Sequence, residues 1–225
     1  MYKRQGEDKF RAARERMLRL DLRGRDITDP RVLAVMSEVP REEFVPQSHR
    51  SQSYNDGPLP IGNNQTISQP YIVALMTQEL RINPECEVLE VGTGSGYQTA
   101  ILSKLANKVY TIERFSELAD SAQKVLDKLG ISNIEFYVGD GSNGWPARRL
   151  PPSGCFDRII ITAGVPEIPE PLVEQLADGG LVVAPVGGRT VQGLVACEKK
   201  GDKLISRTIC DVRFVRLIGK HGFEQ

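Results

Sequence analysis

The sequence has few residues that could form a metal centre or a disulfide framework. It contains only two histidines, His49 and His221, and four cysteines that lie far apart among 225 residues. No two cysteines have the C-x-x-C spacing of zinc sites and redox motifs, so we expect no metal ion and ordinary reduced thiols. Neither histidine lies in a local pattern that indicates a general base.

The sequence also lacks an excess of charge of one sign and any long apolar run. Its 29 basic and 29 acidic residues cancel, which favours neither nucleic acid nor an acidic membrane as a partner. No apolar run is long enough to span a membrane, and the first residues lack the apolar stretch of a signal peptide. We therefore expect a cytoplasmic protein, one compact unit overall, with 40% hydrophobic residues to build its core.

A strand, a glycine turn and a helix follow one another near the middle of the chain. The apolar run Val88–Val91 leads into the pattern G-x-G-x-G, and helical spacing follows over Tyr97–Leu105. The three glycines are Gly92, Gly94 and Gly96. Glycine allows a tight turn and lets a ligand approach the main chain. Glu113 ends the next apolar run, about 20 positions further on, where a ribose-binding carboxylate is expected. The segment predicts an adenosine-type cofactor.

Two details decide between cofactors. A dinucleotide fingerprint needs a third glycine where this chain has Tyr97, and an acid, Glu90, lies two residues before Gly92. A carboxylate at this turn would repel a pyrophosphate but would suit the sulfonium and ammonium groups of S-adenosylmethionine. The pattern therefore favours S-adenosylmethionine, and a nicotinamide-dependent dehydrogenase is the weaker alternative.

From Glu87 onward, strand and helix patterns alternate, which is typical of a parallel sheet with helices on both faces. The expected order is helix Ser116–Leu129 closed by Gly130, strands Ile134–Val138 and Phe156–Thr162, a helix near Pro171–Leu176 ended by Gly179 and Gly180, strand Leu181–Val186, and a hairpin of Val191–Lys199 and Lys203–Val215. The fold class predicted is α/β, a mostly parallel doubly wound sheet with an antiparallel C-terminal hairpin.

The N-terminal part lies outside this alternation and is predicted to be a helical extension. Phe10, Ala13, Met17 and Leu20 have the spacing of one helix that ends near Gly24. Asp29 and Pro30 form a start signal for a second helix. Ser68 is expected to cap a third helix over Gln69–Met76. We divide the chain into residues 1–68, with the first two helices and a candidate acceptor segment, and residues 69–225.

Two further segments indicate binding. Asp140 lies between two glycines just after a strand, where crossover folds bind ligands, and a short acid there can accept a hydrogen bond from an adenine amino group. A plain Gly-Asp-Gly turn is the alternative. The polar segment Ile61–Pro70 leads into a helix N-terminus, whose amides attract anions. It can receive a carboxylate, and helix capping by Ser68 is the simpler explanation.

The chain resembles the protein-L-isoaspartate O-methyltransferase family from about Pro40 to Leu217. The stretches that carry the resemblance are Gln65–Pro70, Leu89–Ala100, Gly139–Gly141, Phe156–Ala163, Pro166–Pro169, Gly179–Gly187 and Val212–Val215. The glycine motif is common to many methyltransferases, whereas Gln-Thr-Ile-Ser-Gln-Pro is specific to this family.

The resemblance implies a Rossmann-like methyltransferase fold that binds S-adenosylmethionine, releases S-adenosylhomocysteine and methylates the free α-carboxyl of L-isoaspartyl residues in damaged proteins. A monomer is expected. Ser68 would be the catalytic residue. The cofactor would be bound by Ile67, Ser68, Gln69, Glu90, Gly92, Gly94, Gly96, Glu113, Asp140 and Gly141, and the acceptor by Gln65, Thr66, Ser68, Val212, Arg213, Phe214 and Val215.

The chain departs from the family pattern at two places. Asn63 and Asn64 stand where a glycine is usual, and Arg216 stands where proline is frequent. Asparagine tolerates a left-handed backbone, so the first change is mild, whereas Arg216 can add a positive charge to the acceptor cleft. Two alternatives remain open: a methyltransferase for a small carboxylic acid or another protein side chain, and a non-catalytic adaptor that retains the fold.

Overall fold

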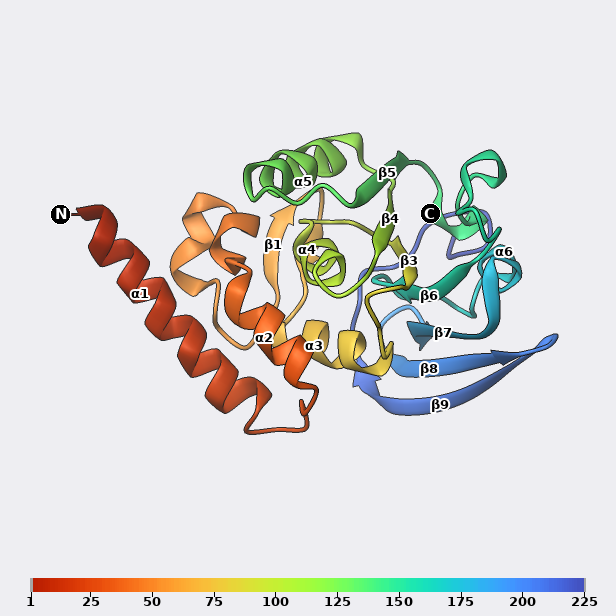
Figure 1. Ribbon diagram of the computed structural model, residues 1–225, viewed down its shortest axis with the longest axis horizontal. Helices are drawn as coiled ribbons and strands as arrows, with labels where there is room; N and C mark the ends of the chain where they lie inside the picture. Colours follow the sequence, from red (N-terminus) through yellow and green to blue (C-terminus); the bar gives the residue numbers. More distant parts are fainter. Residues whose placement is uncertain (1, 225) are drawn as a thin grey trace.

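The computed structural model describes residues 2–224, and its centre is a seven-stranded sheet (Figure 1). The strand order is β5-β4-β3-β6-β7-β8-β9. The first five strands of this order run parallel to one another. Strand β8 pairs antiparallel with β7, and β9 pairs antiparallel with β8. The strands are β3 (Glu87–Val91), β4 (Lys108–Glu113), β5 (Ile134–Val138), β6 (Phe156–Ile161), β7 (Leu176–Gly187), β8 (Gln192–Lys200) and β9 (Lys203–Val212). The predicted parallel sheet with its antiparallel C-terminal hairpin is confirmed.

The chain reverses its direction of travel across the sheet beside β3. It moves outward from β3 through β4 to β5 and then returns to β6 on the other side of β3. In open α/β sheets, ligands bind beyond the carboxyl ends of the strands at such a reversal. The ends of β3 and β6 are therefore the place where a site is expected.

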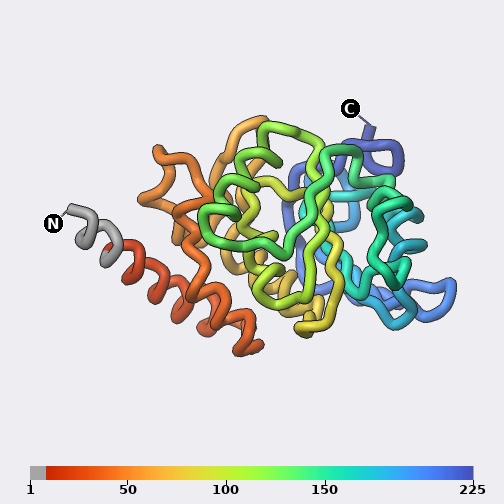
Figure 2. Tube along the Cα trace, turned by 45° about the horizontal axis from the view of Figure 1, so that its top comes forward, coloured from red at the N-terminus to blue at the C-terminus, as the bar shows by residue number. Residues whose placement is uncertain are grey.

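Apolar side chains cover both faces of the sheet, because successive strand residues point to opposite faces. Val88 belongs to one buried cluster, whereas its neighbour Leu89 belongs to the other. The first cluster includes residues of α2 (Pro30–Glu38), α3 (Pro70–Glu79), α4 (Tyr97–Ser103) and α5 (Ser116–Lys128). The second includes Leu172 of the short helix α6 (Glu170–Glu174). Figure 2 shows the course of the chain from a second direction.

The N-terminal extension begins with α1 (Tyr2–Arg16), which continues into the π-helical turn η1 (Met17–Leu22). Leu20, which has the helical spacing of Phe10, Ala13 and Met17, does not lie on the buried face: it is 46% exposed, whereas Leu18 and Leu22 are buried. The Arg23 amide donates to the Leu18 carbonyl, five residues back. This wider turn shifts the buried face by one position, which a regular helical spacing does not anticipate.

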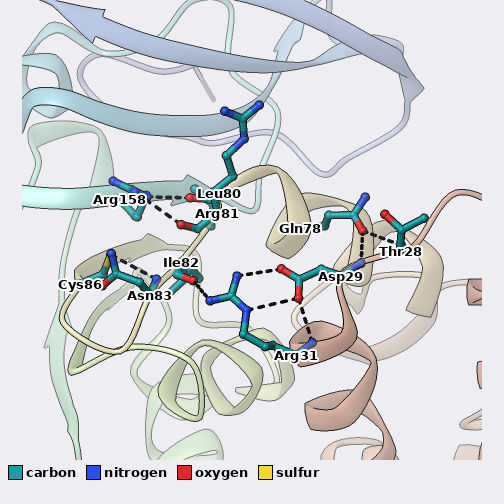
Figure 3. A network of polar contacts seen from close by, with 10 residues as sticks. All are labelled: Thr28, Asp29, Arg31, Gln78, Leu80, Arg81, Ile82, Asn83, Cys86 and Arg158. Atoms are coloured by element: carbon teal, nitrogen blue, oxygen red, sulfur yellow. Dashed lines mark hydrogen bonds and ion pairs between the residues drawn. The ribbon is translucent and has the colours of Figure 1, made fainter.

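Polar contacts attach the extension to the end of α3 (Figure 3). Asp29 caps α2, as predicted, by accepting a hydrogen bond from the Arg31 amide at 2.8 Å. The amide oxygen of Gln78 accepts from the Thr28 and Asp29 amides at 2.7 and 2.9 Å. Arg31 also donates to the Ile82 carbonyl at 2.8 Å. These contacts complement a buried cluster that joins η1 to the sheet, and the division of the chain at residue 68 stays a prediction.

Two predicted boundaries near the C-terminal strands are wrong. Gly179 and Gly180 do not end a helix; they lie inside β7, which starts at Leu176 directly after α6. The pairing of β6 with β7 shifts register there, and a Cβ on Gly180 would lie 2.7 Å from Leu176 Cδ1. The glycines therefore form a bulge. The last strand ends at Val212 and not at Val215.

No helix among residues 2–224 is long and apolar enough to cross a membrane.

Candidate active site

The glycine turn after β3 borders a cavity at the carboxyl ends of the parallel strands. Gly92 and Gly94 have left-handed backbones, with φ of 103° and 54°. A Cβ on Gly92 would lie 2.3 Å from Oγ1 of Thr162, so only glycine fits. The Gly94 amide donates to Oε2 of Glu113 at 2.8 Å, which joins the turn to the end of β4. We call this space the glycine-turn cavity.

The glycine-turn cavity gathers residues from five separate parts of the chain. Its walls come from residues 65–68, 91–95, 112–115 and 214–218, from Gly139 and Gly141, and from a few others. Six of the residues predicted to bind the cofactor lie in these walls: Ile67, Ser68, Gly92, Gly94, Glu113 and Gly141. A Cβ on Gly141 would lie 2.6 Å from Val91, so this second glycine is also required by close packing.

Gly96 does not line the cavity, although the motif predicted a cofactor contact. It precedes α4 with φ of 84°, and a Cβ there would lie 2.9 Å from the Cβ of Ala122 and 3.3 Å from Leu126 Cδ1. We therefore assign Gly96 to the packing of α4 against α5. Local sequence shows the glycine but not the helix that approaches it.

Glu90 is also absent from the cavity wall and is completely buried behind the turn. Its Oε2 accepts hydrogen bonds from the hydroxyls of Thr99 and Thr111, each at 2.6 Å. Its Oε1 is buried and has no partner among the described residues. Burial raises the pKa of Glu90 to about 8, although the two hydroxyl groups act in the opposite direction. A carboxyl group with this pKa is mostly protonated at neutral pH, and a nearby cation would favour its ionised form.

Asp140 makes structural contacts instead of facing the cavity. Its Oδ1 accepts from the amide and hydroxyl of Ser142 at 2.9 and 2.7 Å, and its Oδ2 accepts from the Lys220 amide at 2.8 Å. Burial alone would raise the pKa of Asp140, but these hydrogen bonds outweigh it and hold the pKa below its usual value. Asp140 thus joins the end of β5 to the C-terminal segment, while Gly139 and Gly141 on either side of it line the cavity.

A second cavity adjoins the first, and we call it the acceptor cavity. It is lined by Pro58, Thr66, Ser68, Gln69, Ile72, Thr162, Val191, Asp211, Val212, Arg213, Phe214 and Val215. All the residues predicted to bind the acceptor are among these except Gln65, which lines the glycine-turn cavity. Gln69, predicted as a cofactor residue, lies on the acceptor side only. Residues shared by both cavities form a common wall, so a ligand in one would lie beside a ligand in the other.

Ser68 belongs to this common wall, but its predicted capping role is wrong. Helix α3 begins at Pro70, its N-cap is Gln69, and no side chain caps it. The fixed φ of proline starts the helix without help from Ser68. The Ser68 carbonyl instead accepts a hydrogen bond from Nη2 of Arg41 at 2.7 Å.

The predicted acceptor segment is part of a tight hairpin that borders the cavities. Strands β1 (Leu59–Gly62) and β2 (Gln65–Ile67) are joined by Asn63 and Asn64, whose φ angles are 49° and 55°. Two consecutive left-handed residues form the turn that suits a two-residue hairpin. The first departure from the family pattern is therefore compatible with the local fold. The second, Arg216, lines the glycine-turn cavity.

Thr162 is a site residue that the sequence reasoning missed. It lines both cavities, and its hydroxyl donates to the Gly92 carbonyl at 2.6 Å. The signal was present, since Thr162 is the last residue of a predicted strand and β6 is paired with β3.

All four cysteines are free thiols. Among the described residues no group of histidine, cysteine and carboxylate side chains is arranged to hold a metal ion.

Comparisons with known proteins agree with this geometry. The model of the family described as protein-L-isoaspartate(D-aspartate) O-methyltransferase matches residues 12–222. A protein-L-isoaspartate O-methyltransferase of Methanoregula boonei is 54% identical over 211 residues, which cover 94% of this chain and 95% of that protein. One of Syntrophus aciditrophicus is 48% identical, covering 96% of this chain and 99% of its own length.

Solved structures give the same result. One protein-L-isoaspartate O-methyltransferase structure has a TM-score of 0.82 and 30% identity, with 93% of this chain and 67% of that chain covered. A second, from Plasmodium falciparum, contains S-adenosyl-L-homocysteine; it has a TM-score of 0.76 and 26% identity, and the match covers 93% and 98% of the two chains. The Rossmann-like methyltransferase fold that the resemblance implied is confirmed.

Proposed function

The chain belongs to the protein-L-isoaspartate(D-aspartate) O-methyltransferase family, and from this premise we propose how its own residues perform the reaction. The enzyme transfers a methyl group from S-adenosylmethionine to the free α-carboxyl of L-isoaspartyl residues in damaged proteins and peptides, which initiates their repair.

We assign the glycine-turn cavity to S-adenosylmethionine, which supplies the methyl group as a sulfonium. The cavity fits such a ligand for two reasons. Only Ile61 Cδ1, at 3.6 Å, would approach a Cβ built on Gly94, so this part of the main chain is open to a ligand. The Glu113 carboxylate is fixed by the amides of Gly94 and Phe115 and can accept hydrogen bonds from ribose hydroxyls.

We assign the isoaspartyl carboxylate to the acceptor cavity, beside Ser68. The observation that carries this assignment is the common wall of the two cavities, formed by Thr66, Ser68, Thr162, Phe214 and Val215. Thr66 and Ser68 have hydroxyl groups that can donate to a carboxylate. The segment Val212–Val215 forms the other side of the acceptor cavity, where an extended peptide can lie.

The chemistry requires little from the protein besides position. An α-carboxyl has a pKa of about 3.5, so at neutral pH the acceptor is already an anion and needs no general base. This agrees with a site that contains no histidine in either cavity wall. Holding the carboxylate in near-attack geometry can contribute on the order of 7–11 kcal/mol to the barrier reduction. In our proposal the Ser68 hydroxyl orients the carboxylate and takes no proton.

Replacement of Ser68 tests this assignment. Ser68→Ala should lower the rate of methyl transfer to an isoaspartyl peptide at saturating substrates by about 10- to 100-fold, while the dissociation constant of S-adenosylhomocysteine stays nearly unchanged. Ser206→Ala is a suitable control, because Ser206 is exposed on β9 and lines neither cavity. An unchanged rate in Ser68→Ala would refute the assignment.

We also propose that the enzyme is a cytoplasmic monomer that binds neither nucleic acid nor membrane. Four free thiols suit a reducing compartment, and the balanced charge of the chain offers no general attraction to polyanions. Light scattering behind a sizing column should give the mass of one 24.9 kDa chain. A mass of twice this value at micromolar concentration would contradict the monomer.

A further inference from the structure

A buried cation, Arg41, contacts the main chain of Ser68. Arg41, at the start of the short 3₁₀ helix η2 (Arg41–Phe44), has no exposed surface. Its Nε donates to the Ser53 carbonyl and its Nη2 to the Ser68 carbonyl, both at 2.7 Å. One side chain of the N-terminal extension thus fixes the main chain of the proposed catalytic residue.

The same guanidinium also contacts the cofactor side of the site. Its central carbon lies 4.8 Å from the centre of the Tyr97 ring, and Tyr97 lines the glycine-turn cavity. Phe44, three residues after Arg41, packs edge-on against the same ring, with centroids 5.5 Å apart. Arg41 therefore contacts a residue of the acceptor wall and a residue of the cofactor wall at once.

No carboxylate compensates the charge of Arg41 within residues 9–224. The neighbouring carboxylate, Glu42, is bound by Arg14 and by the Tyr54 hydroxyl instead. Burial lowers the pKa of Arg41 to about 10, so the side chain is still a cation at neutral pH. Its Nη1 is buried and has no hydrogen-bond partner among these residues. Burying a cation without a carboxylate partner costs desolvation free energy that an ion pair would partly offset. This cost points to a role in function.

We propose that Arg41 is a positioning residue for methyl transfer. The guanidinium holds the Ser68 carbonyl and packs on the Tyr97 ring, so it fixes the position of the acceptor wall relative to the cofactor wall. The acceptor carboxylate is thereby aligned with the methyl donor. The proposal rests on the assignment of Ser68 given above. It predicts that Arg41 acts on the rate of the chemical step and not on cofactor binding.

Two replacements of Arg41 test the proposal. In Arg41→Lys the charge remains, but one ammonium group cannot reach both carbonyls in the geometry of the guanidinium fork. In Arg41→Met both hydrogen bonds and the charge are lost. At saturating S-adenosylmethionine and isoaspartyl peptide, we expect the single-turnover rate to fall about tenfold in Arg41→Lys and about 100-fold in Arg41→Met, because a misplacement of about 1 Å has effects of this size. The affinity for S-adenosylhomocysteine should change less than about threefold.

A matched control exists at the other end of α3. Arg158 also donates to main-chain carbonyls, to Leu80 at 2.6 Å and Arg81 at 3.4 Å (Figure 3), and it lines neither cavity. Arg158→Lys should lower the melting temperature and leave the single-turnover rate unchanged. If Arg41→Met does not fold, Arg41→Lys alone carries the test.

The outcomes separate the two proposals. A wild-type rate in Arg41→Lys would overturn the role of Arg41, as would a loss of cofactor affinity that parallels the loss of rate. A slow Arg41→Lys enzyme with normal affinity for S-adenosylhomocysteine would support it. An unchanged rate in Ser68→Ala would instead count against the Ser68 hydroxyl, whose failure is visible in a different variant.

Discussion

The main-chain amide of Gly94 donates a hydrogen bond to the carboxylate of Glu113 across 2.8 Å. The second carboxylate oxygen accepts from the Phe115 amide at 3.0 Å. The acid expected to bind ribose is therefore already held in place by the turn expected to approach the cofactor. A site that is preorganised in this way loses little conformational freedom when its ligand binds.

Glu113→Gln should weaken cofactor binding and the fold together. The amide NH₂ must face either the Gly94 or the Phe115 amide, so two donors would meet at one position. We expect a loss of about tenfold or more in S-adenosylhomocysteine affinity by titration calorimetry, and a loss of about 1–3 kcal/mol in the free energy of unfolding. Glu117→Gln, on the exposed first turn of α5, is the control. Equal affinities in the two variants would contradict this role of Glu113.

Replacement by alanine should have different effects at Gly94 and at Gly96. In Gly96→Ala the new Cβ meets Ala122 and Leu126, so we expect a loss of about 1–3 kcal/mol in the free energy of unfolding from overpacking, beyond the backbone strain. In Gly94→Ala the Cβ has room but enters the cavity wall. The free energy of cofactor binding should therefore change more than the free energy of unfolding. Urea denaturation and calorimetry of both variants check this. The reverse pattern would show that our assignment of Gly96 to packing is incorrect.

Glu90 should make the ligand-free enzyme less stable as the pH rises. Its pKa is about 8 in the fold against 4.5 as the ordinary value, so the folded state binds the proton more tightly than the unfolded state. The stability that this provides is fully present below about pH 4.5 and is lost as the pH rises through 8. Glu90→Gln should remove this dependence and be more stable than the natural protein at pH 8. Melting temperatures of both proteins between pH 6 and 9 provide the measurement.

The same variant reports on charge at the cofactor site. In Glu90→Gln the side-chain oxygen can still accept from both threonine hydroxyls, and the new NH₂ group occupies the place of the oxygen without a partner. If a carboxylate near Gly92 favours a cationic ligand, Glu90→Gln should weaken the binding of S-adenosylmethionine, which has a sulfonium, more than that of S-adenosylhomocysteine, which lacks one. Equal effects on the two ligands would refute this use of Glu90.

Tyr54 should stabilise the whole chain and not only the N-terminal extension. Its hydroxyl donates to Glu42 and accepts from Arg14 at 2.7 Å and from the Arg41 amide at 3.2 Å. Tyr54→Phe should lower the free energy of unfolding by about 1–3 kcal/mol in a single transition. Tyr137→Phe is the control, because the Tyr137 hydroxyl makes no hydrogen bond among residues 9–224. A separate early transition in Tyr54→Phe would argue against one compact unit.

The sequence predicted well those features that depend on local signals. Strand Ile134–Val138 has the expected bounds, and Gly130 follows α5 with a left-handed φ of 70°. Asp29 caps its helix because the capping oxygen and the amide that it binds are two residues apart. The gathering of most predicted acceptor residues in one cavity agrees with the set that the family resemblance implied.

Features that depend on distant neighbours were not predictable. Gly96 is needed because α5 packs on it, and Gly180 because β7 bulges against its own first residue. The burial of Glu90 depends on the hydroxyls of Thr99 and Thr111, which belong to α4 and β4. Arg41 showed no signal at all, because its hydrogen-bond acceptor on Ser68 is 27 residues away.

The most direct test of the account is methyl transfer to two peptides that differ only in the linkage at one residue. With labelled S-adenosylmethionine, the enzyme should form a methyl ester on the α-carboxyl of the L-isoaspartyl peptide and none above background on its L-aspartyl twin. Equal labelling of the two peptides, or labelling of neither, would contradict the assignment of the acceptor cavity to an isoaspartyl carboxylate.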